Sequence, residues 1–352
     1  MKQHPVLLFV LIAFLVGSVV TSSAAAKKPK KPTNKLSAIG TSQLPGEWCQ
    51  FAKAYTLGTR AAGNAMNVTL KSAEYTISQI KVGSSVFRPQ EGEKFLVIHY
   101  TLHNPLPQEQ GVGYATITWT AVDAAGKDRN QEYLGVGVED AKHSQLDQVL
   151  KPAQKIEVFA IIRVDGYGPV PKLMAARYEV TKPVARYDLK GKVTALPLPY
   201  SDPTDTTGAT MLKQIPGVVG QSYITGDFET KVDKVEFVDP PLADEGYDIG
   251  TVYALITLEC KYWGDSSGGI GGSASPTSGF EIKDADGASY TNWNGPLSTS
   301  SYRSIDARAG NGESFRCRLA VAVPKGVQLK TLKLKEYSGY PVLIDVSAFK
   351  AP

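Results

Sequence analysis

In this 352-residue chain, one serine in a glycine-rich stretch has a type and setting that could support catalysis. Gly264 to Gly268 reads GDSSG, which fits the Gly-x-Ser-x-Gly pattern around a hydrolase nucleophile. Such a nucleophile requires a strand–turn–helix and a later histidine, but the last histidine of the chain is His143. We therefore expect Ser266 to lie in a hairpin loop, and no catalytic residue is predicted.

Metal-binding residue types also occur, but their spacing does not favour a site. His99 and His103 share one face of a predicted strand and, at about 3.3 Å per residue, stand roughly 13 Å apart. That distance is too long for two ligands of one metal ion. Asp284 and Asp286 precede Gly287 as in the start of a calcium loop, but the distal acidic ligand is absent. No metal site and no cofactor are predicted.

Aromatic side chains are concentrated in predicted loops, beside asparagines, glycines and prolines. Rings of this kind bury a large area at low entropic cost, which suits contacts to carbohydrate or protein. Their alternative role is to pin the loops of a sandwich. The candidate ligand-binding residues are Tyr290, Trp293, Tyr302 and Tyr167.

The three cysteines are Cys49, Cys260 and Cys317, and an odd number cannot all pair within one chain. By strand alternation, Cys260 and Cys317 both point toward the apolar interior. They are 57 residues apart (317 − 260), as in the inter-sheet bridge of immunoglobulin-type sandwiches. We predict a Cys260–Cys317 disulfide, with two buried thiols as the alternative. Cys49 is then buried or intermolecular.

The elements that must position these residues are strands, because β-branched and aromatic residues recur with period two. Clusters of Gly, Pro, Asn and Asp separate them, as turns require. No segment after the first 26 residues carries a convincing helical stripe, which predicts an all-β fold. The predicted strands are 68–80, 94–103, 115–121, 155–164 and 172–181 in the first half, and 231–238, 251–262, 279–283, 314–323 and 329–336 in the second.

The two halves of the chain repeat one another. QLPGEWCQ at 43–50 returns as QIPGVVGQ at 214–221, and each Pro-Gly is expected to form a turn before a first strand. Further matches follow in the same order, pairing 91–104 with 248–263, 121–130 with 282–292, and 150–164 with 307–323. The repeat predicts two tandem immunoglobulin-like β-sandwich domains; two unrelated β domains are the alternative.

The order of these motifs resembles a bacterial envelope family. A strand ending in Asn, an Asp-x-x-Gly turn, a small-residue turn, a hydrophobic strand and a closing strand are similar to domain-of-unknown-function family 4352, also described as telomeric-repeat-binding-factor-2-like. The resemblance covers 68–181 and 230–336, and departs from the family at insertions 131–148 and 264–277. It implies an immunoglobulin-type sandwich of the secreted immunoprotective-antigen kind, and it brings no catalytic residues.

The N-terminus predicts export. A charged start, an apolar run at Val6–Val20 and an Ala-rich end make residues 1–26 a secretory signal. Fifteen residues span roughly 22 Å as a helix, short of the roughly 30 Å hydrocarbon core, so cleavage is expected over retention as an anchor. A Lys/Pro-rich tether follows at 27–42, then a first domain at 43–200, a linker at 201–213 and a second domain at 214–352.

Charge argues against a nucleic-acid partner. The chain carries a formal +4, but residues 1–35 hold six lysines and no acid, so the remainder carries −2 (4 − 6). We expect a non-enzymatic binding or adhesion module, secreted or extracytoplasmic, that contacts an envelope protein or polysaccharide through loop aromatics. It meets a membrane only through an uncleaved signal. The alternative is a structural spacer, and an enzyme is a remote alternative, because no nucleophile, base and orienting group can be assembled.

Overall fold

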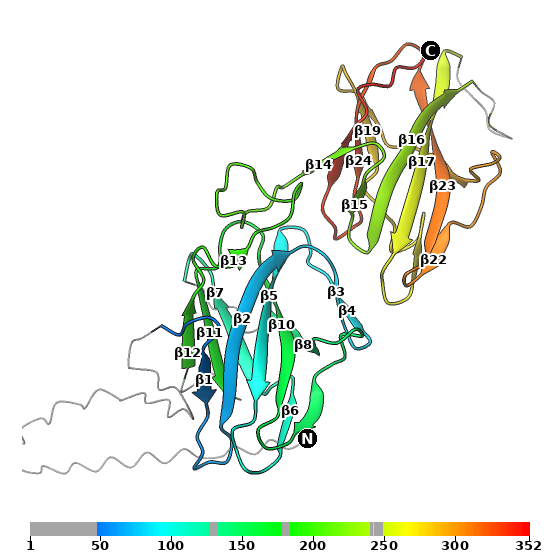
Figure 1. Ribbon diagram of the computed structural model, residues 1–352. Coiled ribbons are helices and arrows are strands. Elements are labelled where there is room, and N and C mark those ends of the chain that lie inside the picture. The colour runs from blue at the N-terminus through cyan, green and yellow to red at the C-terminus, as the bar shows by residue number, and fades with distance from the viewer. Residues whose placement is uncertain (1–47, 127–131, 178–183, 240–241, 243–248) are drawn as a thin grey trace, which may run out of the picture. The chain divides into compact units, whose positions relative to one another are not determined.

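The computed structural model describes residues 48–126, 132–177, 184–239, 242 and 249–352 (Figure 1). The elements formed in these ranges are β-strands, and all of them belong to one compact unit that spans Asn34–Pro352. In the described part of the chain, no helix is long and apolar enough to span a bilayer. The predicted signal, 1–26, and tether, 27–42, lie outside the described residues.

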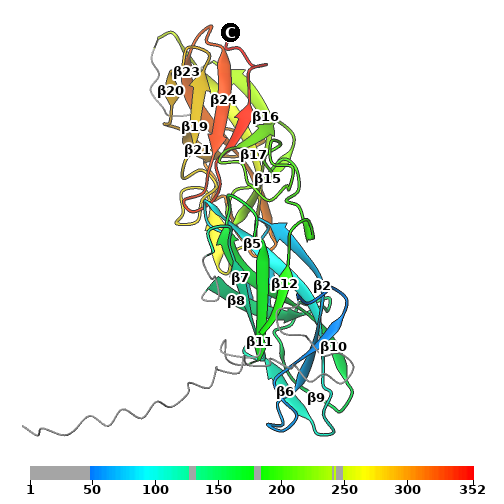
Figure 2. The same ribbon diagram turned by 90° about the vertical axis from the view of Figure 1, so that its left-hand side faces the viewer.

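The first sandwich has two facing sheets (Figures 1 and 2). One runs in the order β1 (Ala54–Leu57), β2 (Met66–Thr76), β5 (Glu93–His103), β10 (Lys155–Asp165) and β8 (Tyr133–Val138), with β13 (Val193–Thr194) also paired to β2. The other is β12 (Val184–Asp188), β11 (Lys172–Arg177) and β7 (Ile117–Val122). The rings of Tyr100 on β5 and Trp119 on β7 meet edge to face at 5.0 Å, so the two sheets pack across a shared core.

The second sandwich repeats this arrangement. One sheet is β15 (Ser222–Ile224), β16 (Phe228–Val238), β17 (Thr251–Tyr262), β23 (Ser314–Pro324) and β21 (Asn294–Leu297). The other is β14 (Ile215–Val218), β25 (Val342–Asp345), β24 (Leu329–Leu334), β19 (Glu281–Asp284) and β20 (Ser289–Tyr290). The order β15-β16-β17-β23 matches β1-β2-β5-β10, and β25-β24-β19 matches β12-β11-β7. The predicted all-β fold of two sandwiches is confirmed.

Three short hairpins or ribbons complete the described strands. They are β3 (Ile80–Val82) with β4 (Ser85–Phe87), β6 (Gln110–Gly113) with β9 (Asp147–Leu150), and β18 (Ser267–Gly269) with β22 (Arg308–Gly310). The insertion expected at 131–148 supplies β8 and the start of β9. Through β8, the insertion therefore adds a strand to the larger sheet of the first sandwich.

The second copy of the opening phrase forms a strand, so the predicted Pro-Gly turn is wrong there. Pro216 and Gly217 lie inside β14, which runs parallel to β25 at the end of its sheet. An edge position tolerates the missing N–H of proline. A Cβ added to Gly217 would stand 2.6 Å from Cδ1 of Ile344, so close packing explains the glycine. In the first copy, residues 43–47 lie outside the described residues, and Cys49 forms a parallel bridge to Tyr187 of β12.

Cys260 and Cys317 are buried, as strand alternation predicts, but the predicted inter-sheet disulfide is corrected by the sheet register. β17 and β23 are neighbours in one sheet, where Cys317 pairs with Leu258 and Cys260 pairs with Phe315. The two cysteines are thus diagonal neighbours, with Cβ atoms on the order of 7 Å apart, whereas a disulfide needs about 3.5–4.5 Å. In the structure both are thiols.

A lysine lies in the core of the first sandwich. Lys94 of β5 is fully buried, and its ammonium donates hydrogen bonds to the carbonyl oxygens of Gly168 (2.6 Å), Gly166 (3.3 Å) and Ala209. Its Nζ also stands 4.5 Å from the ring centroid of Tyr75, a cation–π contact. A charged group can be buried here because three acceptors and an aromatic face replace its water shell.

The lysine fixes a segment that the sequence analysis described as a linker. Burial lowers the pKa of Lys94 to about 8, and the carboxylates of Asp165 and Asp205 oppose that shift, so the group is an ammonium at neutral pH. Its partner Ala209 and the neighbouring Met211 are buried. The segment 201–213 is therefore packed against the first sandwich, and its course toward β14 is set by this contact.

Replacement of Lys94 by methionine is expected to lower the free energy of unfolding by at least about 2 kcal/mol, because three carbonyl groups lose a charged donor. Urea unfolding followed by tryptophan fluorescence measures the change. The matched control is Lys71→Met, whose ion pair with Glu157 is exposed and which should shift stability by less than about 0.5 kcal/mol. Equal stability of the two variants would contradict the role of Lys94.

The two thiols of the second sandwich are expected to be unreactive in the native protein. Burial raises the pKa of Cys317 to about 12 and that of Cys260 well above its ordinary value, so neither is a thiolate at pH 8. Iodoacetamide without reductant should leave both unmodified in native protein and alkylate both in urea, as read by peptide mass. A pair that resists alkylation in urea until reductant is added would instead show a disulfide.

Candidate functional site

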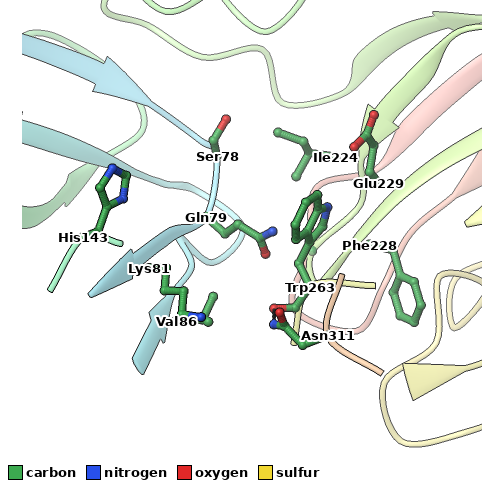
Figure 3. Close-up of a pocket in the computed structure, with 11 residues that line it drawn as sticks. Ser78, Gln79, Lys81, Val86, His143, Ile224, Phe228, Glu229, Trp263 and Asn311 are labelled. Carbon is green, nitrogen blue, oxygen red and sulfur yellow. Dashed lines mark hydrogen bonds between the residues drawn. The ribbon is translucent and has the colours of Figure 1, made fainter. Parts of the chain in front are cut away.

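A cleft of about 510 Å³ lies between the β3–β4 hairpin of the first sandwich and loops of the second (Figure 3). Its volume falls within the roughly 300–1,000 Å³ of typical small-molecule sites. We call it the hairpin cleft. The first sandwich lines it with Ser78, Gln79, Lys81, Val86 and His143. The second lines it with Ile224, Gly226, Phe228, Glu229, Trp263 and Asn311.

The first wall is held by hydrogen bonds within one loop and between that loop and the β3–β4 hairpin. The N–H of Gly83, at the tip of the β3–β4 hairpin with φ +59°, donates to the carbonyl oxygen of His143 at 2.8 Å. The carboxylate of Asp140 accepts the N–H groups of Lys142 (2.9 Å) and Ser144 (3.0 Å). These bonds to Ser144 and Lys142 hold the pKa of Asp140 below its ordinary value. The insertion that carries His143 is therefore pinned to the hairpin.

The second wall is built around Trp263, the residue after β17. The backbone N–H of Trp263 donates to the backbone carbonyl oxygen of Asp227 at 2.9 Å. Nδ2 of Asn311 donates to the carbonyl oxygens of Trp263 (2.7 Å) and Gly264 (2.9 Å). Nζ of Lys261 stands 3.9 Å from the indole centroid. Backbone and side-chain contacts together hold the indole in place.

The cleft contains hydrogen-bond acceptors that the described residues leave available. Oε1 of Gln79 is buried and has no hydrogen-bond partner among the described residues. Asn311 uses its Nδ2 on two carbonyls, which leaves Oδ1 as an acceptor. In Figure 3 the side chains of Gln79 and Trp263 extend toward each other from opposite walls. A buried acceptor without a donor costs about 1–3 kcal/mol, so a donor from solvent or ligand is expected at this point.

A polar seam joins the two sandwiches beside the cleft; it comprises residues 88–91, 226–227 and 335–340. The N–H of Glu91 donates to the carbonyl oxygen of Ser338 (2.9 Å), and the Tyr340 hydroxyl donates to that of Gln90 (2.6 Å). Nζ of Lys335 lies 2.6 Å from Oε2 of Glu91. These bonds fix the two walls of the cleft at a set separation.

Two carboxylates and one guanidinium form the inner part of the seam. Nε of Arg88 lies 2.5 Å from Oδ1 of Asp227, whose N–H donates to Oε2 of Glu336 at 2.7 Å. Burial, together with the nearby carboxylate of Asp227, raises the pKa of Glu336 to about 7, against the opposing effects of the Asp227 N–H bond and the charge of Arg88. Burial also raises the pKa of Asp227, against the opposing charge of Arg88. Gly226, with φ +84°, leaves room for Glu336, since an added Cβ would overlap its carboxylate.

A smaller hollow of about 250 Å³ adjoins the cleft and shares Ser78, Gln79, Lys81 and His143 with it. Its floor carries His99, whose Nδ1 lies 2.5 Å from Oε1 of Glu139 and whose Nε2 lies 3.6 Å from Oε1 of Glu74. The carboxylate of Glu74, with help from that of Glu139, raises the pKa of His99. Within the described residues, no three His, Cys, Asp or Glu side chains are arranged to hold a metal ion.

The aromatic residues predicted to bind a ligand do not line the cleft. The Tyr290 hydroxyl donates to Oδ2 of Asp284 at 2.8 Å, and Trp293 packs partly buried against the core. Tyr302 is 41% exposed, and Tyr167, which is 43% exposed, lies on the first sandwich beside Gly92. The structure does not bring the four together, and their part in ligand binding stays a prediction.

The exposed Ser266 lies next to β18 in a glycine-rich loop, as expected. Trp263, Gln79 and Asn311 were not predicted as site residues. Trp263 had a signal, because it is one of four tryptophans and follows a long apolar strand directly. Gln79 and Asn311 had none, since their orientation depends on contacts between distant segments.

Comparison with known proteins gives only a distant likeness. No protein-family profile matches the chain, so the resemblance to family 4352 stays a prediction, and no curated protein matches either. The chain is similar to an uncharacterized β-sandwich protein from Clostridium difficile 630, with 16% identity and a TM-score of 0.28 over 40% of this chain and 91% of that one. It is also similar to a protein of Bacillus subtilis subsp. subtilis str. 168 provisionally classed as a lipoprotein, with 14% identity and a TM-score of 0.27 over 35% of this chain and 38% of that one.

The seam is expected to make stability fall as pH rises from about 5 to about 7. Glu336 has a folded pKa of about 7, above its unfolded value, so the folded state binds more protons in this range. Glu336→Gln keeps the acceptor for the Asp227 N–H and removes the charge. It should flatten the pH profile and add about 1–3 kcal/mol at pH 7.5. Urea unfolding at pH 5, 6, 7 and 8 tests this, and parallel profiles for both proteins would contradict it.

Proposed function

We propose that the protein is a non-enzymatic binding module, exported from the cell, that holds a component of the cell envelope in the hairpin cleft. The carrying observation is the buried Oε1 of Gln79, which has no hydrogen-bond partner in the described part of the chain and faces the indole of Trp263. An aromatic surface with unused acceptors recognises a ligand by contact and hydrogen bonding. Export is supported by the signal-like segment 1–26.

Affinity capture from native envelope extract with the purified protein tests the proposal. Bound protein and sugar are read by mass spectrometry. Wild-type protein should retain a saturable partner, and Trp263→Ala should lose at least about tenfold in retention. Circular dichroism and thermal unfolding confirm that the variant is folded.

The matched control is Tyr302→Ala, which removes an exposed aromatic side chain that does not line the cleft. It should bind as wild type does. Loss of binding on Tyr302→Ala alone would move the site to the loop aromatics. Recovery of nothing by wild-type protein would overturn the proposal and favour a spacer.

A further inference from the structure

We infer, on the basis of the proposed function, that the hairpin cleft takes an uncharged saccharide whose hydroxyl or amide N–H groups donate to the oxygens of Gln79, Asn311 and Glu229 while an apolar ring face lies against Trp263. Oε1 of Gln79 is the fixed point, because it is buried and has no partner in the described protein. Nδ2 of Asn311 is already used by two carbonyls, so this residue presents its oxygen.

The charge of the lining argues against an ionic ligand. Lys81 and Glu229 carry opposite charges, so neither sign dominates. An anion would face the oxygens of Gln79, Asn311 and Glu229, where acceptor would meet acceptor. A cation would meet Lys81 in the wall and Lys261 above the indole. An uncharged ligand meets neither penalty.

The hydrogen-bonding pattern separates a saccharide from other neutral ligands. A hydrocarbon would leave Oε1 of Gln79 without a donor, at a cost of about 1–3 kcal/mol. A peptide backbone brings one carbonyl acceptor with nearly every N–H, and those carbonyls would meet a wall rich in oxygens. A sugar hydroxyl can rotate so that its hydrogen points at a fixed acceptor. The C–H groups of a sugar ring can also pack against an aromatic face.

The extent of the hollow favours more than one sugar unit. The cleft of about 510 Å³ and the adjoining hollow of about 250 Å³ share Ser78, Gln79, Lys81 and His143. A ligand that occupies the cleft can therefore continue past Lys81 along the first sandwich. The structure assigns to this surface a short oligosaccharide.

Isothermal titration calorimetry of the purified protein with tetramers of N-acetylglucosamine, of glucose and of galacturonate tests the inference. At least one neutral tetramer should bind, and the galacturonate tetramer should bind at least about tenfold more weakly. Gln79→Met removes the acceptor at similar size and should weaken neutral binding about tenfold, the value of one hydrogen bond.

The outcomes separate the ligand class from the binding function. If an envelope partner is captured through Trp263 but no neutral tetramer binds or competes with it, the saccharide is wrong and the binding module stands. Equal affinity for the galacturonate tetramer would overturn the uncharged ligand. Unchanged affinity in Gln79→Met would overturn the assignment of the acceptor. Failure of both capture and titration would remove the proposed function itself.

Discussion

The buried ammonium of Lys94 is the contact on which the connection between the two sandwiches depends. It satisfies carbonyl oxygens of Gly166, Gly168 and Ala209 at once, and so ties the chain after β10 to the segment 201–213. That segment leads directly to β14, the edge strand of the second sandwich. A charge in the core is costly unless its donors are all used. Here three carbonyl acceptors offset that cost, and the bond to Ala209 also holds the segment 201–213 against the first sandwich.

The seam then holds the walls of the cleft through a small number of polar contacts. Arg88, Asp227 and Glu336 are close together, so removal of Arg88 would leave two neighbouring carboxyl groups without their counter-charge. Such clusters contribute less to stability than an apolar contact of equal size, but they demand one geometry. Because the backbone N–H of Trp263 donates to the backbone carbonyl of Asp227, that geometry also positions the backbone of Trp263. The same residues that join the sandwiches therefore also orient the site.

Long alternating strands were predictable from the sequence because their periodicity is local. The prediction 251–262 coincides with β17, and 314–323 falls within β23 (Ser314–Pro324). Short strands such as β14 and β8 were missed, because Pro-Gly in β14 and two glycines in β8 resemble turns until a neighbouring strand is present to pair with them. The predicted Cys260–Cys317 disulfide was wrong for a related reason. Alternation gives the face of a side chain, but not which strand lies beside it.

The candidate site was harder to predict, because it is defined by unused hydrogen-bonding capacity and not by residue type. Tyr302 was predicted to bind a ligand because it is an aromatic residue in a loop. Exposure of a ring does not by itself define a ligand-binding site. Gln79 is an ordinary residue in the sequence. It becomes informative only when the hairpin that follows it and the loop of Trp263 bury its oxygen without a donor. A site formed by segments so far apart in the chain is encoded in the packing of the two sandwiches, so the residues that fix this packing are as much a part of recognition as those that line the cleft.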